Sequence, residues 1–148
     1  MGRNRVILAD DNIDIRRRLV QILAAEYDVV AALENGEQLV AVAKILKPDL
    51  LVVDVSMPLL NGLDALQRLR LEGIHAKTVV VSANGSPAYV RRAFEMGATG
   101  YVLKGTGAKD LPVALKTVLH GGHFVSPAID YTGHLDLEMA ARATSLQT

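Results

Sequence analysis

The chain of 148 residues contains no cysteine and no tryptophan, and its formal net charge at pH 7 is zero. Without cysteine there is no disulfide framework, no thiolate-bound zinc or iron–sulfur cluster and no cysteine nucleophile. A balanced charge also lacks the basic excess typical of domains that grip the phosphate backbone of nucleic acids. The composition thus argues against secreted disulfide scaffolds, metal–thiolate proteins and nucleic-acid-binding modules.

Long apolar runs are missing as well. The first run, residues 6–9, stops at two aspartates, whereas a signal peptide needs a longer apolar region and a membrane-spanning helix needs about 20 apolar residues. Half of the residues are nevertheless hydrophobic, which is enough to form a core and excludes intrinsic disorder. We therefore expect a single cytoplasmic globular domain that does not enter a membrane.

Five short apolar runs alternate with stretches of helical periodicity. The runs occupy residues 6–9, 29–33, 50–53, 78–81 and 101–103. Nearly continuous, valine-rich runs of this kind are typical of parallel strands that are covered on both faces. Apolar residues spaced as one face of a helix follow each run, for example Ile15, Leu19 and Ile22. The alternation predicts an α/β fold with a doubly wound, five-stranded parallel sheet.

The pattern changes after about residue 122. The segment that follows shows no strand signal and one weak helical stripe, formed by Leu135, Met139 and Leu146. We interpret residues 1–124 as the domain and residues 125–148 as a C-terminal tail or linker with at most a partly helical structure.

Polar residues follow four of the five predicted strands. Asp10 and Asp11 follow the first strand, Asp54 the third, Ser82 the fourth and Lys104 the fifth. The carboxyl ends of parallel strands meet at the edge where such sheets bind ligands, so these side chains should lie together. Neighbouring carboxylates repel each other unless a cation lies among them, and oxygen ligands suit Mg²⁺. Each residue alone is most simply a cap or loop residue, but together they predict a phosphoryl acceptor site with an aspartate nucleophile.

Several segments also carry a resemblance to a known family. They are residues 6–12 (VILADDN), 48–58 (PDLLVVDVSMP), 61–62 (NG), 81–83 (VSA), 93–98 (AFEMGA) and 100–104 (GYVLK). Over roughly residues 4–124 the chain resembles the receiver domain of two-component response regulators. Its residues 121–127 are similar to the subfamily whose receivers precede a LuxR-type helix-turn-helix. The resemblance implies a flavodoxin-like (βα)5 fold with strand order 2-1-3-4-5.

The resemblance implies a role for each carboxylate. Asp54 would accept a phosphoryl group from the phosphohistidine of a sensor histidine kinase. Asp10 and Asp11 would hold Mg²⁺ together with Asp54 and the backbone carbonyl of Ser56. The metal would offset the repulsion between the attacking carboxylate and the incoming phosphoryl group.

The resemblance also implies a switch. Lys104 and Ser82 would contact oxygens of the phosphoryl group, and movement of Ser82 would open a space for the ring of Tyr101. The surface of the fourth helix, fifth strand and fifth helix would then change. On the residues alone, Tyr101 is equally a core aromatic side chain. Ser56 and Asn84 would line the path of the water that hydrolyses the phosphoryl group.

One residue departs from the family pattern. Many receivers follow the lysine with a proline in a cis peptide bond, whereas this chain has Gly105. A cis bond before a residue other than proline costs about 2.5–4 kcal/mol. The sequence therefore leaves two options, a trans bond or a strained loop, and the choice affects where Lys104 points.

Other functions fit these residues less well than a receiver does. A pseudo-receiver that binds partners without phosphorylation is the main alternative. A phosphatase of the haloacid dehalogenase type is disfavoured because Ser56 replaces the second carboxylate of an Asp-x-Asp motif. A flavodoxin-like flavin carrier is disfavoured because no hydroxyl-rich phosphate loop follows the first strand and tryptophan is absent. We expect the chain to catalyse only its own phosphorylation and dephosphorylation.

The output is expected to be control of transcription, through other parts of a longer chain or through a partner. No helix-turn-helix fits into residues 125–148, so we expect no sequence-specific DNA binding by this chain. It would be either a stand-alone receiver or a receiver cut within the linker. The family also implies a homodimer on phosphorylation.

Overall fold

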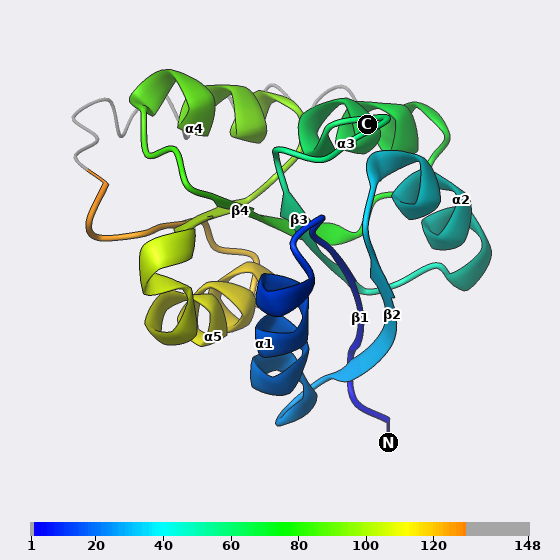
Figure 1. The fold of residues 1–148 in the computed structure, drawn as a ribbon, viewed down its shortest axis with the longest axis horizontal. Helices are drawn as coiled ribbons and strands as arrows, with labels where there is room; N and C mark the ends of the chain where they lie inside the picture. Colours follow the sequence, from blue (N-terminus) through cyan, green and yellow to red (C-terminus); the bar gives the residue numbers. More distant parts are fainter. Residues whose placement is uncertain (1, 130–148) are drawn as a thin grey trace.

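The computed structural model describes residues 2–129 as a parallel sheet between two layers of helices (Figure 1). The strands are β1 (Arg5–Ala9), β2 (Asp28–Leu33), β3 (Leu50–Asp54), β4 (Lys77–Ser82), β5 (Gly100–Leu103) and β6 (Phe124–Val125). The helices are α1 (Ile13–Ala24), α2 (Gly36–Leu46), α3 (Gly62–Leu71), α4 (Pro87–Glu95) and α5 (Gly107–Leu119), with a 3-10 turn, η1 (Lys104–Thr106), before α5.

The strands pair in the order β2-β1-β3-β4-β5-β6, and every pair is parallel. The predicted doubly wound sheet and its order 2-1-3-4-5 are therefore confirmed. The two-residue strand β6 is an addition that the sequence pattern did not predict. It pairs with β5 through Phe124 opposite Gly100 and Val125 opposite Tyr101. A run of two residues is too short to show a strand period.

The folded part continues past the predicted boundary at residue 124. Ile129 is buried and packs into the core beside α4 and β5. The helical stripe expected at Leu135, Met139 and Leu146 lies outside the described residues, so the interpretation of the remaining segment as a tail or linker stays a prediction.

The sheet separates two apolar cores. Helices α1 and α5 cover one face, and α2, α3 and α4 cover the other (Figure 1). Along β1, Val6 and Leu8 pack toward the first pair of helices, whereas Ile7 and Ala9 pack toward the other three. Side chains that alternate in this way while all are buried explain why the strands are continuously apolar in sequence. Within residues 2–129, no helix combines the length and apolar character that crossing a membrane requires.

Asparagine side chains begin three of the helices. The Asn12 Oδ1 atom accepts the backbone N–H groups of Asp14 and Ile15, and Asn61 and Asn35 begin α3 and α2 in the same way. Such a cap satisfies backbone donors that a helix leaves unpaired and contributes about 1 kcal/mol. The caps at Asn12 and Asn61 also hold the two short loops that follow β1 and β3.

The loop between β3 and α3 closes tightly over the end of β3. The Gly62 N–H donates to the carbonyl of Val55 at 2.8 Å. A Cβ atom on Gly62 would lie 2.2 Å from the carbonyl oxygen of Asp54, far inside van der Waals contact. The start of α3 can therefore approach Asp54 only if residue 62 has no side chain.

We expect Gly62→Ala to lower the free energy of unfolding by about 1–3 kcal/mol, the usual cost of overpacking, although alanine favours helices more than glycine does. Urea unfolding followed by circular dichroism measures the change. Gly107→Ala is the matched control, because Gly107 also begins a helix and its Cβ would meet no atom within 4 Å. An equal loss in both variants would contradict this explanation.

Candidate functional site

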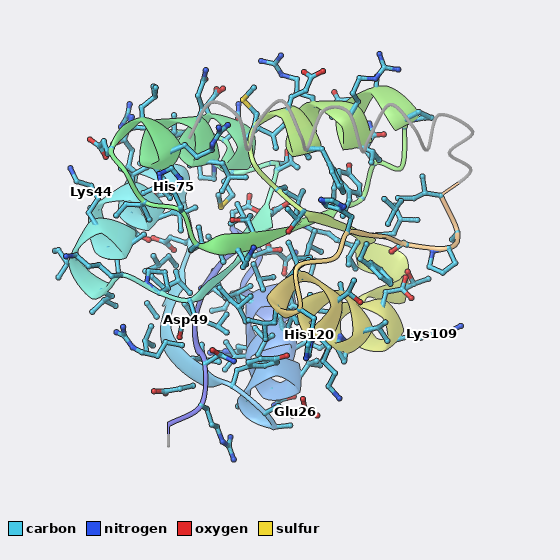
Figure 2. All side chains as sticks on the ribbon, turned by 180° about the vertical axis from the view of Figure 1, so that it is seen from behind. Glu26, Lys44, Asp49, His75, Lys109 and His120 are labelled. Atoms are coloured by element: carbon cyan, nitrogen blue, oxygen red, sulfur yellow. The ribbon has the colours of Figure 1, made fainter. Side chains whose placement is uncertain are left out.

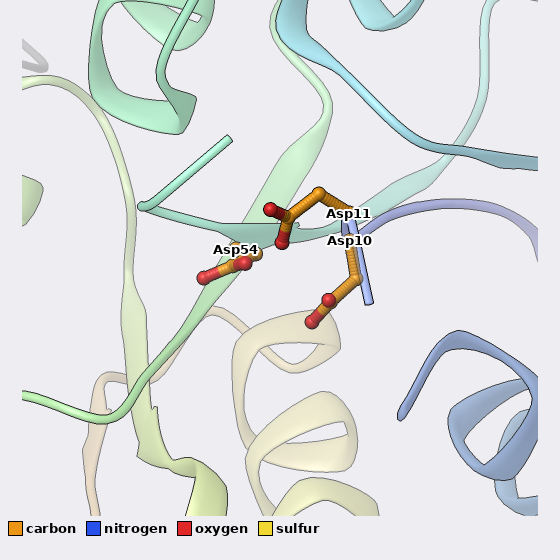
Figure 3. Close-up of side chains that lie close together, drawn as sticks. All are labelled: Asp10, Asp11 and Asp54. Carbon is orange, nitrogen blue, oxygen red and sulfur yellow. The ribbon is translucent and has the colours of Figure 1, made fainter. Parts of the chain in front are cut away.

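Three carboxylates meet at the carboxyl edge of the sheet. Asp10 and Asp54 are 1 % and 2 % exposed, whereas Asp11 is exposed to solvent. One oxygen atom from each lies within 4.8 Å of the others, and the three side chains lie close together in Figure 3. The contact follows from strand order, because β1 and β3 are neighbours paired in register at Ala9 and Val53. The structure thus brings together the three predicted carboxylates.

Lys104 reaches into this cluster from the end of β5. Its Nζ atom lies 3.3 Å from Asp10 Oδ2 and 3.1 Å from Asp54 Oδ2. No described peptide bond is cis, so the bond between Lys104 and Gly105 is trans. Of the two options that the sequence left, the trans bond is the one adopted, and the lysine still contacts both buried carboxylates.

Each buried carboxylate has one oxygen with a hydrogen bond and one without. Oδ1 of Asp10 accepts the Asn12 N–H at 2.9 Å, and Oδ1 of Asp54 accepts the Ser56 N–H at 3.2 Å. The two Oδ2 atoms have no hydrogen-bond partner and face only the ammonium of Lys104 as ion pairs. One ammonium does not neutralise three carboxylates. The two unpartnered oxygens and the nearby carboxylate of Asp11 form a ligand set that fits Mg²⁺.

The site shifts the ionisation of its charged groups. Burial, followed by the charge of Asp10, raises the pKa of Asp54 from 3.8 to about 6, although Lys104 and the Ser56 N–H oppose the shift. Burial alone would lower the pKa of Lys104, but Asp54 and Asp10 raise it above its ordinary value. Lys104 is therefore an ammonium at neutral pH, and Asp54 is an easily protonated carboxylate.

The polar residues at the end of β4 are linked to β5. Ser82 is 6 % exposed, and its Oγ accepts the Asn84 N–H at 3.0 Å. Tyr101 is fully buried on β5, and its hydroxyl donates to the carbonyl of Asn84. Ser56 lies beside Asp54 and is exposed. Tyr101 is thus a core side chain that also contacts the loop after Ser82, so its role as a switch stays a prediction.

Two residues support the site without having been expected there. The Arg16 guanidinium donates to the backbone carbonyl of Asp10 at 2.8 Å. Ser126 is 1 % exposed, and its Oγ accepts the Leu103 N–H at 3.0 Å, next to Lys104. No sequence pattern predicts either contact, because both contacts depend on how separate elements pack.

Most of the chain matches one known protein family. The family model described as the response regulator receiver domain matches residues 6–116. The chain belongs to this family. The predicted resemblance is confirmed, and the matched range contains every residue that was assigned to the candidate site.

Curated relatives of this receiver domain are longer regulators. The chain is 33% identical over 129 residues to the transcriptional regulatory protein DegU of Brevibacillus brevis, which covers 86% of this chain and 55% of DegU. It is 35% identical over 126 residues to the nitrate/nitrite response regulator protein NarL of Escherichia coli K12, covering 84% of this chain and 58% of NarL. The chain therefore spans less than two thirds of these relatives.

Solved structures share the receiver fold. A two-component response regulator of the LuxR family from Aurantimonas sp. SI85-9A1 superposes with a TM-score of 0.80 at 24% identity, covering 98% of this chain and 99% of that one. The isolated receiver of RcsB from Salmonella enterica serovar Typhimurium, solved with the phosphomimetic BeF3⁻, gives a TM-score of 0.78 at 24% identity, covering 86% and 96% of the two chains.

The raised pKa of Asp54 makes the stability of this receiver depend on pH. The folded pKa of about 6 lies above the ordinary 3.8, so the folded protein binds this proton more tightly than the unfolded chain does. The proton on Asp54 therefore contributes to the free energy of unfolding. This contribution is present in full below about pH 4 and is lost as pH rises through about 6.

The Asp54→Asn variant has no group at this position that can ionise. We expect its free energy of unfolding, relative to that of the wild type, to rise by up to about 3 kcal/mol from pH 4 to pH 7. Urea unfolding in EDTA at a series of pH values measures this difference. A difference between the two proteins that stays constant from pH 4 to pH 7 would contradict the assignment.

Proposed function

We propose that this chain accepts a phosphoryl group on Asp54 from the phosphohistidine of a sensor histidine kinase. The observation that carries the proposal is the Asp54 Oδ2 atom, which is buried at the ligand-binding edge, has no hydrogen-bond partner and lies 3.1 Å from the Lys104 ammonium. Membership in the receiver family supports it. The RcsB receiver of the same fold was solved with a mimic of a phosphoryl group.

In the proposed reaction an oxygen of the Asp54 carboxylate attacks the phosphorus, and the bond between phosphorus and the histidine nitrogen breaks. The product is a mixed anhydride on Asp54. At pH 7 a group with a pKa of about 6 is mostly ionised, so Asp54 is available as a nucleophile. The Lys104 ammonium lies where it would offset the charge of the incoming phosphoryl oxygens.

The three carboxylates and the backbone carbonyl of Ser56 would hold Mg²⁺. The unpartnered oxygens of Asp10 and Asp54 support this assignment, together with the nearby carboxylate of Asp11. The bound ion would supply positive charge to the phosphoryl oxygens at the same edge. The chain would then catalyse only its own phosphorylation and dephosphorylation.

The proposed switch runs from Ser82 to Tyr101. A phosphoryl group adds about −1.5 to −2 charge and three acceptor oxygens. If the Ser82 side chain moves to donate to one of these oxygens, the loop that is bonded to its Oγ through the Asn84 N–H would move with it. Tyr101 would follow, because its hydroxyl is bonded to the Asn84 carbonyl. Ser56 and Asn84, both exposed, would line the path of the hydrolytic water.

The proposed output is regulation of transcription in the cytoplasm, by a longer form of the protein with a LuxR-type domain or by a partner. The relatives that the chain matches are longer regulators, and the match covers 55% of DegU and 58% of NarL. Dimerisation on phosphorylation is part of the proposal. It is supported by two exposed apolar side chains on the helices of the switch surface, Tyr89 on α4 and Val113 on α5. We propose that this chain does not bind DNA directly.

Intact mass spectrometry after incubation with Mg²⁺ and acetyl phosphate tests the proposal. We expect one phosphoryl group on the wild-type chain and none on Asp54→Asn. Asp28→Asn is the matched control, since it removes an exposed carboxylate on β2 and should keep full uptake. Uptake by Asp54→Asn would contradict the site. If Mg²⁺ binds but neither acetyl phosphate nor a kinase phosphorylates the wild type, the pseudo-receiver is the better description.

Metal binding has its own test. We expect Mg²⁺ at 10 mM to raise the melting temperature of the wild type, because a ligand that binds only the folded state stabilises it. Asp11→Asn should abolish most of this increase while leaving the fold intact, since Asp11 is exposed. Asp14→Asn removes a carboxylate from the first turn of α1 outside the cluster and should keep the increase. Equal responses of the two variants would argue against the proposed ligands.

A further inference from the structure

The segment that follows β6 lies at the same edge of the sheet as the candidate site. In Figure 2 the chain runs back from the end of α5, marked by His120, toward the end of α5 where Lys109 lies, and it passes between α4 and α5. Because β6 is parallel to β5, residues 126–129 follow the carboxyl end of β6. The proposed phosphoryl transfer assigns no role to these four residues, which we call the strap.

Ser126 fixes the beginning of the strap to β5. Its side chain is 1 % exposed, and its Oγ accepts the Leu103 N–H at 3.0 Å. The Ser126 N–H donates to the carbonyl of Tyr101 at 2.9 Å. Both partners are backbone groups of the same strand. The position of Ser126 is therefore set by β5 and does not depend on the loop that follows β4.

A tight turn then sets the position of Ile129. The Ile129 N–H donates to the Ser126 carbonyl at 2.9 Å, and Pro127 occupies the second position of this four-residue turn. Proline is preorganised for that position because its ring fixes the backbone angle φ. Pro127 and Ala128 are exposed, whereas Ile129 is only 8 % exposed. The strap thus holds one apolar side chain in the protein at a fixed distance from a buried serine.

Ile129 packs against the loop between β4 and α4. A Cβ atom on Gly85 would lie 3.3 Å from Ile129 Cγ1 and 3.2 Å from Leu103 Cδ2. These distances are tighter than ordinary van der Waals contact, so the two side chains lie directly over Gly85 with little free space. Ile129 belongs to the core on the side of α2, α3 and α4, and the partly buried Leu103 packs against that core.

The same loop is bonded to the residues of the proposed switch. The Asn84 N–H donates to Ser82 Oγ at 3.0 Å, and the Asn84 carbonyl accepts the Tyr101 hydroxyl. Gly85 follows Asn84 directly, and consecutive Cα atoms stay about 3.8 Å apart across a trans peptide bond. A displacement of Asn84 by Ser82 therefore reaches the residue against which Ile129 packs.

Strand order sets the direction of this displacement. The strand that carries Asp54, β3, lies on one side of β4, whereas β5 and β6 lie on the other side. A Ser82 side chain that is drawn toward a phosphoryl group on Asp54 would move the loop away from the side on which the strap lies. Because Ser126 is bonded to β5, the strap would not follow, and the contact between Gly85 and Ile129 would open.

We propose that the strap responds to phosphorylation: Ile129 packs against Gly85 while Asp54 is unmodified, and phosphorylation of Asp54 releases it. The proposal rests on the proposed function of Asp54. The contact involves a single apolar side chain, so a small shift of the loop is enough to change its population between packed and exposed. Release of Ile129 passes the state of Asp54 to the residues that follow in the chain.

A single introduced cysteine tests whether Ile129 is released. The chain contains no cysteine, so Ile129→Cys provides the only thiol, whose rate of reaction with iodoacetamide depends on its exposure. In the presence of Mg²⁺, we expect beryllium fluoride, a mimic of the phosphoryl group, to raise this rate several-fold. Val40→Cys is the matched control, because Val40 is 6 % exposed and lies on α2 in the same core. An unchanged rate at residue 129, or equal acceleration at both positions, would overturn the proposal.

Fluorine NMR separates failure of the strap from failure of the proposed function. Beryllium fluoride bound to the protein gives a signal that is distinct from the signals of the free species. We expect this signal for the wild type and for both cysteine variants, but not for Asp54→Asn. A bound signal without faster reaction at residue 129 would overturn the strap alone. If the wild type gave no bound signal, the phosphoryl site would fail and the strap would fail with it.

The coupling must also act in the reverse direction. If binding of the mimic releases Ile129, then weakening the packing of Ile129 must favour binding. We expect Ile129→Ala to lower the beryllium fluoride concentration at half-saturation several-fold, and Ile129→Leu to stay close to the wild type. Val40→Ala, which truncates a similarly buried side chain, should leave this concentration unchanged.

The binding measurement distinguishes coupling from a merely structural contact. Circular dichroism establishes that each variant is folded. A structural contact would leave the affinity of Ile129→Ala for beryllium fluoride unchanged or weaken it, and either result would overturn the proposal. Tighter binding by Ile129→Ala alone, together with faster reaction of the thiol at residue 129, is the result that supports it.

Discussion

Repulsion among three carboxylates at one edge of the sheet is the constraint around which the rest of this site is arranged. Asp10 and Asp54 are buried where water cannot screen their charges, and Asp11 adds a third carboxylate from the solvent side. Lys104 relieves part of the repulsion by pairing with both buried groups. Burial of Asp54, together with the remaining repulsion from Asp10, still raises the pKa of Asp54 to about 6. A site with this much negative charge favours a divalent cation, and a bound cation would in turn offset the negative charge of an incoming phosphoryl group.

The fold holds that charge in place through backbone contacts. Neighbouring parallel strands set the distance between Asp10 and Asp54. The asparagine caps fix the loops behind both residues, and Gly62 lets α3 close against the carbonyl of Asp54. The Leu103 N–H is bonded to Ser126, which follows β6 and anchors the strand end that carries Lys104. Because none of these contacts involves a long flexible side chain, the geometry is prepared before any ligand arrives.

Local patterns in the sequence were sufficient for most of the fold. Valine-rich runs and apolar stripes are properties of short segments, so they predicted the five main strands and the helices that follow them. They failed at β6, where two residues form a strand only because β5 offers a free edge beside them. They also gave no sign of the contact between Arg16 and the Asp10 carbonyl. Contacts of this kind join segments that are distant in the chain or adjacent only after folding.

The sequence by itself determined which groups meet at the carboxyl edge, because parallel strands bring their carboxyl ends together whatever the packing details are. It also determined membership in the receiver family, since the motifs and their spacing are properties of the amino-acid sequence. Only the tertiary structure decided that the bond after Lys104 is trans and that this lysine contacts two carboxylates at once. The hydrogen bond from the Leu103 N–H to the Ser126 Oγ belongs to the same class. It forms only because β6 pairs with β5, which brings together two residues that lie 23 positions apart in the chain.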